Sequence, residues 1–114
     1  KDVLDGSGGH NLIYGGNGAD VLIGGNCDIL AGGRGPDQFV FRADFGVNTI
    51  LDFDVRNDYL QFDDSVFNSV KSILDHTTNT ALGALISDGD GGSVLLLGVN
   101  KSQLMAHSND LLIG

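Results

Sequence analysis

The sequence predicts a mainly β fold: short parallel strands wound into a flattened coil over residues 1–40, then a mixed β region with one short helix. Three observations predict it. A nine-residue pattern recurs over the first 40 residues, 18 of the 114 residues are glycine, and the periodicity changes after residue 40. A chain of this length fits one small domain with a thin core, so a bound ligand can decide its stability.

The nine-residue pattern is Gly-Gly-x-Gly-x-Asp-x-U-x, in which U is a large apolar residue. Residues 15–23 and 32–40 fit it in full, residues 24–31 lack one place, and residues 6–14 have Asn11 in the sixth place. Because the chain opens inside a unit, we expect it to be a fragment of a longer polypeptide.

Each unit predicts a sharp turn followed by a short strand. Six Gly-rich residues can reverse the backbone because glycine accepts positive φ, and the next three residues form a strand whose middle side chain points inward. Leu4, Leu22 and Phe39 would line one sheet, and Ile13 and Leu30 the other. This core is one residue deep per strand and does not by itself offset an ordering cost of about 1–2 kcal/mol per residue. Something else must hold the turns together.

The acidic residues indicate what that is. All 15 are aspartate, and the formal net charge is −9. Short carboxylates on tight turns are suitable ligands for a hard cation such as Ca²⁺. Loops two units apart stack on one edge, where their sixth-place carboxylates repel unless a cation lies between them. Composition alone leaves a Gly/Asp-rich region without metal as the alternative, but the spacing favours Ca²⁺.

These repeats resemble the RTX, or haemolysin-type, calcium-binding repeat, over about a third of the chain. The resemblance implies a calcium-bound parallel β-roll. It implies that one loop gives the carbonyls of places one and three plus its Asp, and that the next loop gives those of places two and four plus its own Asp. The first site implied in this way consists of Gly15, Asn17, Asp20, Gly33, Gly35 and Asp37.

The same resemblance implies two lesser sites. The second, on the opposite edge, would consist of Gly6, Gly8, Asn11, Gly25, Asn26 or Cys27, and Asp28. We expect it to be weaker or empty, because Asn11 is neutral and the second loop is one residue short. The third would consist of Asp2, Gly16, Gly18 and Asp20. Its upper loop is incomplete, and Asp20 would bridge two ions.

Residues 41–114 are predicted to form a mixed β cap, separate from the repeats at 1–40. Apolar residues on one helical face predict a helix from about 65 to 77, with capping chemistry at Asp63 to Ser65. Strands are predicted at 39–41, 49–53, 58–62, 84–87 and 93–98, the last two joined as a hairpin.

Several phrases in residues 39–99 are similar to the region that follows the repeats in many secreted RTX proteins, and 110–113 are similar to its acidic-then-apolar tail. This likeness implies a cap on the open end of the roll and an uncleaved type I secretion signal. The implied partners are calcium, the N-terminal remainder of the same polypeptide and a type I secretion ABC transporter. The implied localisation is extracellular, after export from a bacterium.

Composition argues against other functions. A net negative chain does not neutralise phosphates, which argues against nucleic acid and anionic membranes, and no apolar run approaches the roughly 20 residues of a membrane span. The sequence has no Glu for acid–base work and no nucleophile motif, so we expect no enzymatic activity from this part. A polysaccharide-recognition or adhesion module is the alternative function, although basic and aromatic residues are dispersed.

Other candidate residues have simpler interpretations. His10, His76 and His107 lack metal-ligand spacing and are expected in surface or packing roles, and Cys27 is expected to be a free thiol. The sequence from Asp88 to Gly92 resembles the opening of an EF-hand loop, but Val99 at the twelfth place favours a turn.

Three aspartates beyond the repeats are open to two interpretations. Asp52, Asp54 and Asp58 are expected to face solvent on strands and turns. The alternative is that Asp44, Asp52 or Asp54 completes a calcium site with Gly24 and Asp28 of the shortened loop.

Overall fold

The computed structural model describes residues 3–6, 10–43, 45–89 and 91–113. The elements described within the first 62 residues are short strands: β1 Val3–Asp5, β2 Leu12–Tyr14, β3 Val21–Gly24, β4 Asp28–Ala31, β5 Gln38–Phe41, β6 Val47–Ile50 and β7 Tyr59–Phe62. The remaining elements are α1 Val70–Asp75, β8 Thr77–Asn79, β9 Gly83–Ser87, β10 Ser93–Leu97, α2 Lys101–Ala106, a 3₁₀ turn Ser108–Asp110 and β11 Leu111–Ile113.

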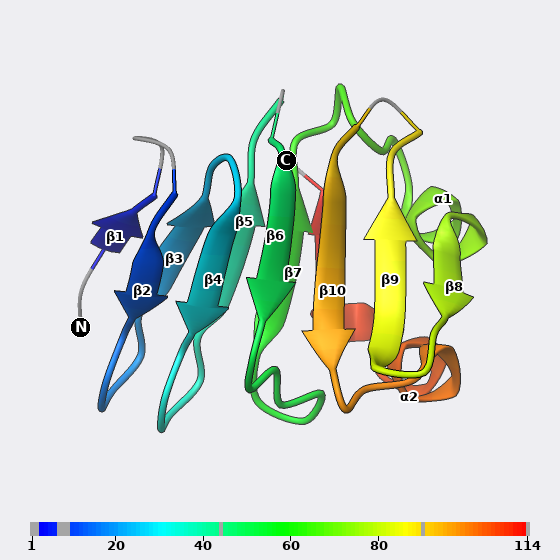
Figure 1. Cartoon of the computed structure of the whole chain (residues 1–114). Coiled ribbons are helices and arrows are strands. Elements are labelled where there is room, and N and C mark those ends of the chain that lie inside the picture. Colours follow the sequence, from blue (N-terminus) through cyan, green and yellow to red (C-terminus); the bar gives the residue numbers. More distant parts are fainter. Residues whose placement is uncertain (1–2, 7–9, 44, 90, 114) are drawn as a thin grey trace.

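Two sheets lie face to face, and the chain alternates between them (Figure 1). The first is parallel, in the order β1-β3-β5-β7-β11, and the second runs β2-β4-β6-β10-β9-β8, with β10, β9 and β8 antiparallel. This confirms the mainly β fold. The predicted pairing is also confirmed: Leu4 lies beside Leu22 and Leu22 beside Phe39, while Ile13 lies beside Leu30 on the other sheet.

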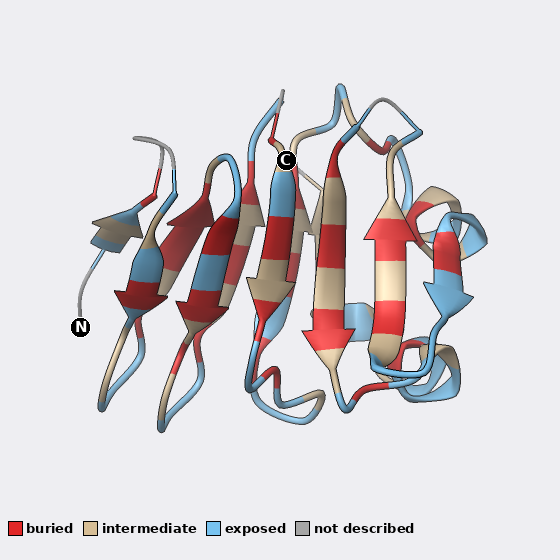
Figure 2. Cartoon of the chain, viewed as in Figure 1, coloured by how far each residue is buried: buried red, intermediate tan, exposed pale blue. Residues whose placement is uncertain are grey.

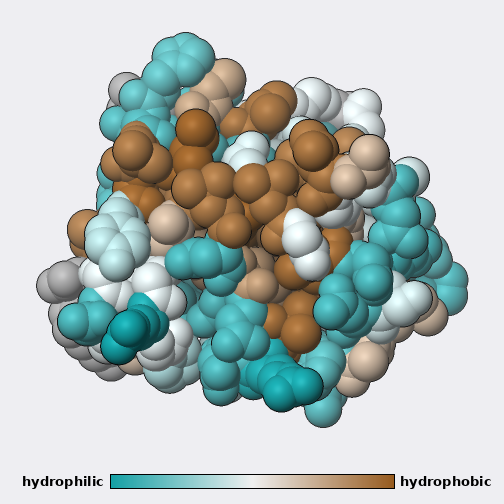
Figure 3. Space-filling model, turned by 60° about the horizontal axis from the view of Figure 1, so that its bottom comes forward, coloured by the Kyte–Doolittle hydropathy of each residue, from teal (hydrophilic) through white to brown (hydrophobic). Residues whose placement is uncertain are grey.

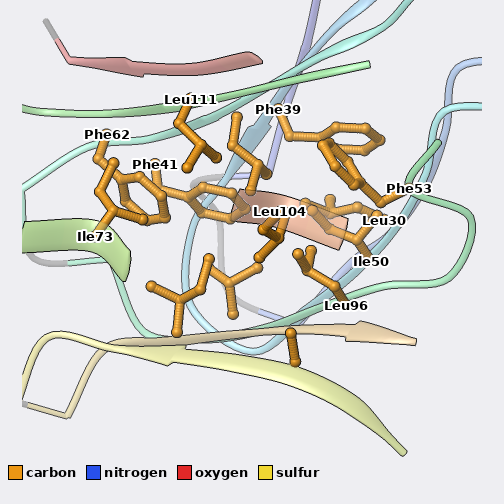
Figure 4. Close-up of a cluster of buried hydrophobic side chains, with 14 of the residues drawn as sticks. Leu30, Phe39, Phe41, Ile50, Phe53, Phe62, Ile73, Leu96, Leu104 and Leu111 are labelled. Atoms are coloured by element: carbon orange, nitrogen blue, oxygen red, sulfur yellow. The ribbon is translucent and has the colours of Figure 1, made fainter. Parts of the chain in front are cut away.

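The core lies between the sheets and follows from the period-two alternation of each strand. Buried and more exposed residues alternate along the strands (Figure 2). Figure 4 shows Phe39, Phe41 and Phe62 from one sheet in the same buried cluster as Leu30 and Ile50 from the other, with Phe62 beside Ile73, and all of these side chains are fully buried. Burying each such side chain contributes about 1.5–3 kcal/mol.

The helices differ from the prediction of one helix at 65–77. That segment is helical only at α1, because residues 63–67 form a turn in which Val66 and Phe67 donate to the carbonyl of Asp63. Ser69 caps the helix through its hydroxyl, which accepts from the Ser72 amide at 3.0 Å. Thr77 then begins β8, which the sequence analysis did not predict.

Helix α2 was also missed. It has a reciprocal capping box between Asn100 and Gln103, and Leu104 is its buried residue. In the remaining segments, β6 ends at Ile50 rather than 53, the hairpin of β9 and β10 forms as predicted, and residues 111–113 add a strand parallel to β7. No helix among the described residues is long and apolar enough to cross a membrane.

The outer face of the six-stranded sheet is apolar. Asp28 is the one charged residue within its six strands, and that side chain is buried. Leu12, Tyr14 and Ile29 are exposed on this face, and Figure 3 shows a continuous apolar area across the surface. Tyr14 is the aromatic residue that these six strands contain.

Candidate metal centre

Loops from successive coils stack at each end of the strands (Figure 1). At one end lie residues 15–20, 32–37 and 51–58, which lead into β3, β5 and β7. At the other end lie the connections that lead into β4 and β6. The order of loops on each edge follows the order of strands in the sheet.

The loops 15–20 and 32–37 repeat one backbone conformation. Gly16 and Gly33 have φ of 82° and 83°, and Gly18 and Gly35 have φ of 94° and 95°. These left-handed values favour glycine and account for its recurrence at places two and four.

Backbone carbonyls fill the space between these two loops. A Cβ on Gly33 would overlap the carbonyl oxygen of Gly16, and a Cβ on Gly35 would lie 2.6 Å from that of Gly18. From the opposite direction, the carbonyl oxygen of Gly32 would lie 2.8 Å from a Cβ on Gly15. The oxygens of Gly16, Gly18 and Gly32 therefore lie at the interface between the loops.

This distribution differs from the one that the resemblance implies. There, Gly15, Asn17, Gly33 and Gly35 supply this pair of loops, and Gly16 and Gly18 supply the pair with Asp2. In the structure, the carbonyl oxygens of Gly16 and Gly18 lie against Gly33 and Gly35 of the loop 32–37, and the assignment of Gly15, Asn17, Gly33 and Gly35 to an ion stays a prediction. Asp2 and Gly8 lie outside the described residues.

A ladder of carboxylates runs along the same edge. The amide of Asp20 donates to Oδ1 of Asp37 at 2.9 Å, and the amide of Asp37 donates to Oδ1 of Asp58 at 2.8 Å. All three side chains are buried. The expectation that Asp58 faces solvent is therefore wrong, because it occupies the sixth place of a third loop.

The second carboxylate oxygen of Asp37 marks the open position in this ladder. Asp37 is 0% exposed, and its Oδ2 has no hydrogen-bond partner among the residues that the structure describes. Burial raises the pKa of Asp37 above 3.8, and the nearby charges of Asp20 and Asp52 raise it further, against the lowering effect of the Asp20 amide. An anion in this setting is stabilised by a cation beside it.

The donor set indicates which kind of cation fits. The described residues contain no cluster of three or more His, Cys, Asp or Glu side chains that could hold a metal. An ion here would therefore depend on carbonyl oxygens as well as two carboxylates, and all-oxygen sites of that kind suit Ca²⁺.

The ladder ends differently at Asp58. Its Oδ2 accepts the amide of Asp54 at 2.9 Å, so both of its oxygens bind backbone N–H groups. Burial is the main cause that raises the pKa of Asp58 to about 6, and the charges of Asp37 and Asp54 add to the rise.

The opposite edge has a similar ladder whose oxygens are already bonded. The amide of Asn11 donates to Oδ1 of Asp28 at 2.8 Å, and the amide of Gly25 donates to Oδ2 of Asp28 at 2.7 Å. The carbonyl of Gly6 accepts from Nδ2 of Asn11, and that of Gly25 accepts from Nδ2 of Asn48. The second predicted site thus brings together Gly6, Asn11, Gly25 and Asp28, but their hydrogen bonds are made within the protein.

Other predicted residues lie elsewhere. Asn26 is exposed in the short loop, and Cys27 is an exposed free thiol with φ of 64°. Asp52 and Asp54 are exposed, and Asp52 binds the loop 32–37 while Asp54 binds Arg56 and Asn57. The alternative that these two aspartates join Gly24 and Asp28 is therefore wrong. Asp44 lies outside the described residues.

Sequence reasoning missed Asp58, Asn48 and the role of Asp52. A signal for the first two was present: Asp58-Tyr-Leu-Gln fits the last four places of the repeat, and Asn48-Thr-Ile parallels Asn11-Leu-Ile. Both segments pair in register with the repeats, at Tyr59 beside Gln38 and Asn48 beside Asp28. Asp52 had no comparable signal.

Residues 1–26 match the family profile described as RTX calcium-binding nonapeptide repeat (4 copies). Over these residues the chain is therefore similar to a repeat family that binds Ca²⁺. The match includes the loop 15–20 and ends before the loop 32–37. A comparison with curated proteins found no match.

Proposed function

We propose that this chain is a calcium-binding module that folds as a parallel β-roll when Ca²⁺ joins the loops 15–20 and 32–37. The observation that carries the proposal is the buried Oδ2 of Asp37, which has no hydrogen-bond partner among the described residues. The residues that would hold the ion are Gly16, Gly18, Asp20, Gly32 and Asp37. Bound calcium would neutralise the two carboxylates.

The chain's own residues already prepare this position. The Asp20 amide fixes Oδ1 of Asp37, which leaves Oδ2 for a ligand. Extracellular calcium modules bind at about 0.1–1 mM, so cytosolic calcium would leave these loops in mutual repulsion. At about 100 times the dissociation constant, binding to the folded state alone adds roughly 2.7 kcal/mol per site.

We further propose that the module supports type I secretion and stability of a larger extracellular bacterial protein. Calcium-dependent folding suits this role, since a chain that stays loose in low calcium can be exported and then folds outside. The repeat family is non-catalytic, and we assign any catalysis to other parts of the polypeptide. The polysaccharide-recognition alternative has less support, because the apolar face of the six-stranded sheet carries Tyr14 as its one aromatic residue among the strands.

The test is far-ultraviolet circular dichroism of the full chain in excess chelator, then with millimolar Ca²⁺ and, separately, Mg²⁺. We expect chelation to remove most of the β signal of the repeats and leave some helix signal, because α1 and α2 lie outside the loops. Magnesium should not restore it, since Mg²⁺ requires a smaller octahedral site. An unchanged spectrum and melting temperature after chelation would refute the proposed function.

A further inference from the structure

Asp52 binds the loop 32–37 through both carboxylate oxygens. Its Oδ1 accepts the amide of Gly32 at 2.9 Å, and its Oδ2 accepts the amide of Gly33 at 2.9 Å. The backbone before it is fixed, because the amide of Leu51 donates to the carbonyl of Leu30 at 2.9 Å. Asp52 therefore reaches the loop from a held position at the end of β6.

These two hydrogen bonds fix the orientation of two carbonyls. A peptide unit is planar and trans, so the direction of an N–H determines the opposite direction of the C=O in the same unit. The Gly33 amide shares its peptide unit with the carbonyl of Gly32, which faces Gly15 across the space between the loops. The Gly32 amide shares its unit with the carbonyl of Ala31, which accepts the amide of Gly15 at 2.9 Å.

The backbone at Gly33 is also restricted by its contact with the loop 15–20. Gly33 has a left-handed φ of 83° and lies directly against the carbonyl of Gly16. Glycines retain wide backbone freedom unless other contacts restrict them. An anion bound to the N–H side of a peptide also polarises its carbonyl, which strengthens that oxygen as an acceptor.

We propose that Asp52 is a positioning residue of the calcium site: its carboxylate holds the peptide units of Gly32 and Gly33 so that the Gly32 carbonyl faces the ion between the loops. The inference rests on the proposed function and deepens it, since it places control of calcium affinity on a residue beyond the repeats. Asp52 would not touch the ion. It would set how well the loop 32–37 is preorganised for it.

The variant Asp52→Asn tests whether Asp52 positions the Gly32 carbonyl or only contributes to the overall stability of the fold. Asparagine has nearly the same size, but it accepts at one oxygen and presents an NH₂ group to the second amide. Removing the charge also weakens cation binding at a distance, so a matched control is needed. Asp54→Asn removes the same charge two residues away, where the carboxylate bonds the Arg56 amide and the Asn57 side chain rather than the loop.

The experiment is a calcium titration by calorimetry of the wild type, Asp52→Asn and Asp54→Asn, with the ¹³C carbonyl shift of Gly32 recorded before and after calcium. We expect a midpoint about 5- to 20-fold higher for Asp52→Asn, a change under twofold for Asp54→Asn, and a smaller calcium-induced Gly32 shift in Asp52→Asn alone. Leu104→Ala, which removes a buried core side chain of α2 rather than a hydrogen bond to the loop 32–37, should leave that carbonyl shift unchanged at saturating calcium.

Three results would overturn the inference. The first is a midpoint for Asp52→Asn within twofold of the wild type, and the second is an equal increase in Asp54→Asn. The third is failure of Asp52→Asn to fold in saturating calcium while Leu104→Ala folds, which would mark Asp52 as a general structural residue. If the wild type binds no calcium, the proposed function is refuted as well. If the wild type binds calcium and one of these three results is found, only the inference about Asp52 is refuted.

Discussion

Replacing Asp37 with asparagine should have opposite effects on the calcium-bound and calcium-free states. The substitution keeps an oxygen for the Asp20 amide, which is bonded at 2.9 Å, but replaces the buried Oδ2 by an NH₂ group. That group would direct a donor at the cation. Loss of one charge-assisted contact costs about 1.5–3 kcal/mol, which corresponds to a calcium midpoint about 10- to 100-fold higher.

Without calcium, Asp37→Asn should stabilise the folded protein rather than weaken it. Burial, and then the charges of Asp20 and Asp52, raise the pKa of Asp37, so ionising this carboxyl costs more free energy in the folded state than in the unfolded state. A neutral asparagine relieves that penalty. In chelator, we therefore expect Asp37→Asn to have a higher melting temperature and more β signal than the wild type.

Calorimetric titration with Ca²⁺ and thermal unfolding in chelator would measure both effects. Asp20→Asn should raise the midpoint about as much as Asp37→Asn, and Asp28→Asn should raise it less, because both Asp28 oxygens already accept amides. Asp75→Asn is the control, since this exposed residue pairs with Lys71 at 2.9 Å on α1. A shift for Asp75 as large as that for Asp37 would refute the stacked-loop assignment.

Three further predictions concern the loops, the pH response and the second helix. Gly33→Ala should destabilise the calcium-bound protein in urea by about 2–4 kcal/mol, because the added Cβ would overlap the Gly16 carbonyl. Gly16→Ala has nearly the same left-handed φ, but no atom of the described residues lies within 4 Å of its added Cβ, so it should cost about 1–2 kcal/mol, and equal losses would argue against loop contact. In chelator, lowering the pH from 7 to 5 should add β signal, because the folded-state pKa of about 6 for Asp58 lies above the unfolded value of 3.8, and protonation over this pH range therefore favours the folded state by about 1 kcal/mol. This gain should be absent in Asp58→Asn, and it should reverse below pH 4, where Asp54, Asp63 and Asp75, whose pKa values are lowered, lose their hydrogen bonds. Leu104→Ala should lower the free energy of unfolding by about 2–5 kcal/mol, while Met105→Ala, 57% exposed on the same helix, should change it by less than about 0.5 kcal/mol.

The repeats could be predicted from the sequence because one spacing determines both the strands and the loops. The nine-residue period placed Leu22 beside Phe39 and Ile13 beside Leu30, and the structure has those pairs. The direction of each carbonyl could not be read in this way. It depends on how a peptide unit is rotated, and at Gly32 that rotation is held by Asp52, a residue 20 positions later with no place in the repeat.

The region beyond residue 40 was predicted less well because its signals are short. Val66 and Phe67 suggested a longer helix, yet Phe67 is buried through a turn and packs edge-on against Phe62 at 5.1 Å between ring centroids. Helix α2 has six residues and buries Leu104, too little for a helical periodicity to register. The segment from Asp58 to Gln61 retains the last four places of the repeat but lacks the preceding glycines, so the glycine-rich pattern does not identify it.

The two edges share one series of hydrogen bonds between sixth-place residues, but they differ in whether those side chains need an ion to balance them. On one edge the sixth places are Asp20, Asp37 and Asp58, and the carboxylates leave a buried oxygen on Asp37 without a donor from the described residues. On the other edge the series is Asn11, Asp28 and Asn48, in the same pattern of amide-to-Oδ1 hydrogen bonds.

Asparagine supplies what the first edge lacks. Its NH₂ group donates to a loop carbonyl, from Asn11 to Gly6 at 2.9 Å and from Asn48 to Gly25 at 3.1 Å. It also separates the carboxylates, so no two aspartates are adjacent in that ladder. At this edge the asparagine NH₂ groups bind the loop carbonyls and the lower charge reduces carboxylate repulsion. We propose that a cation has both effects at the other edge. As calcium is withdrawn, the loops 15–20 and 32–37 should therefore loosen first, and the strands β2, β4 and β6 beside the Asn11–Asp28–Asn48 edge should lose their pairing later.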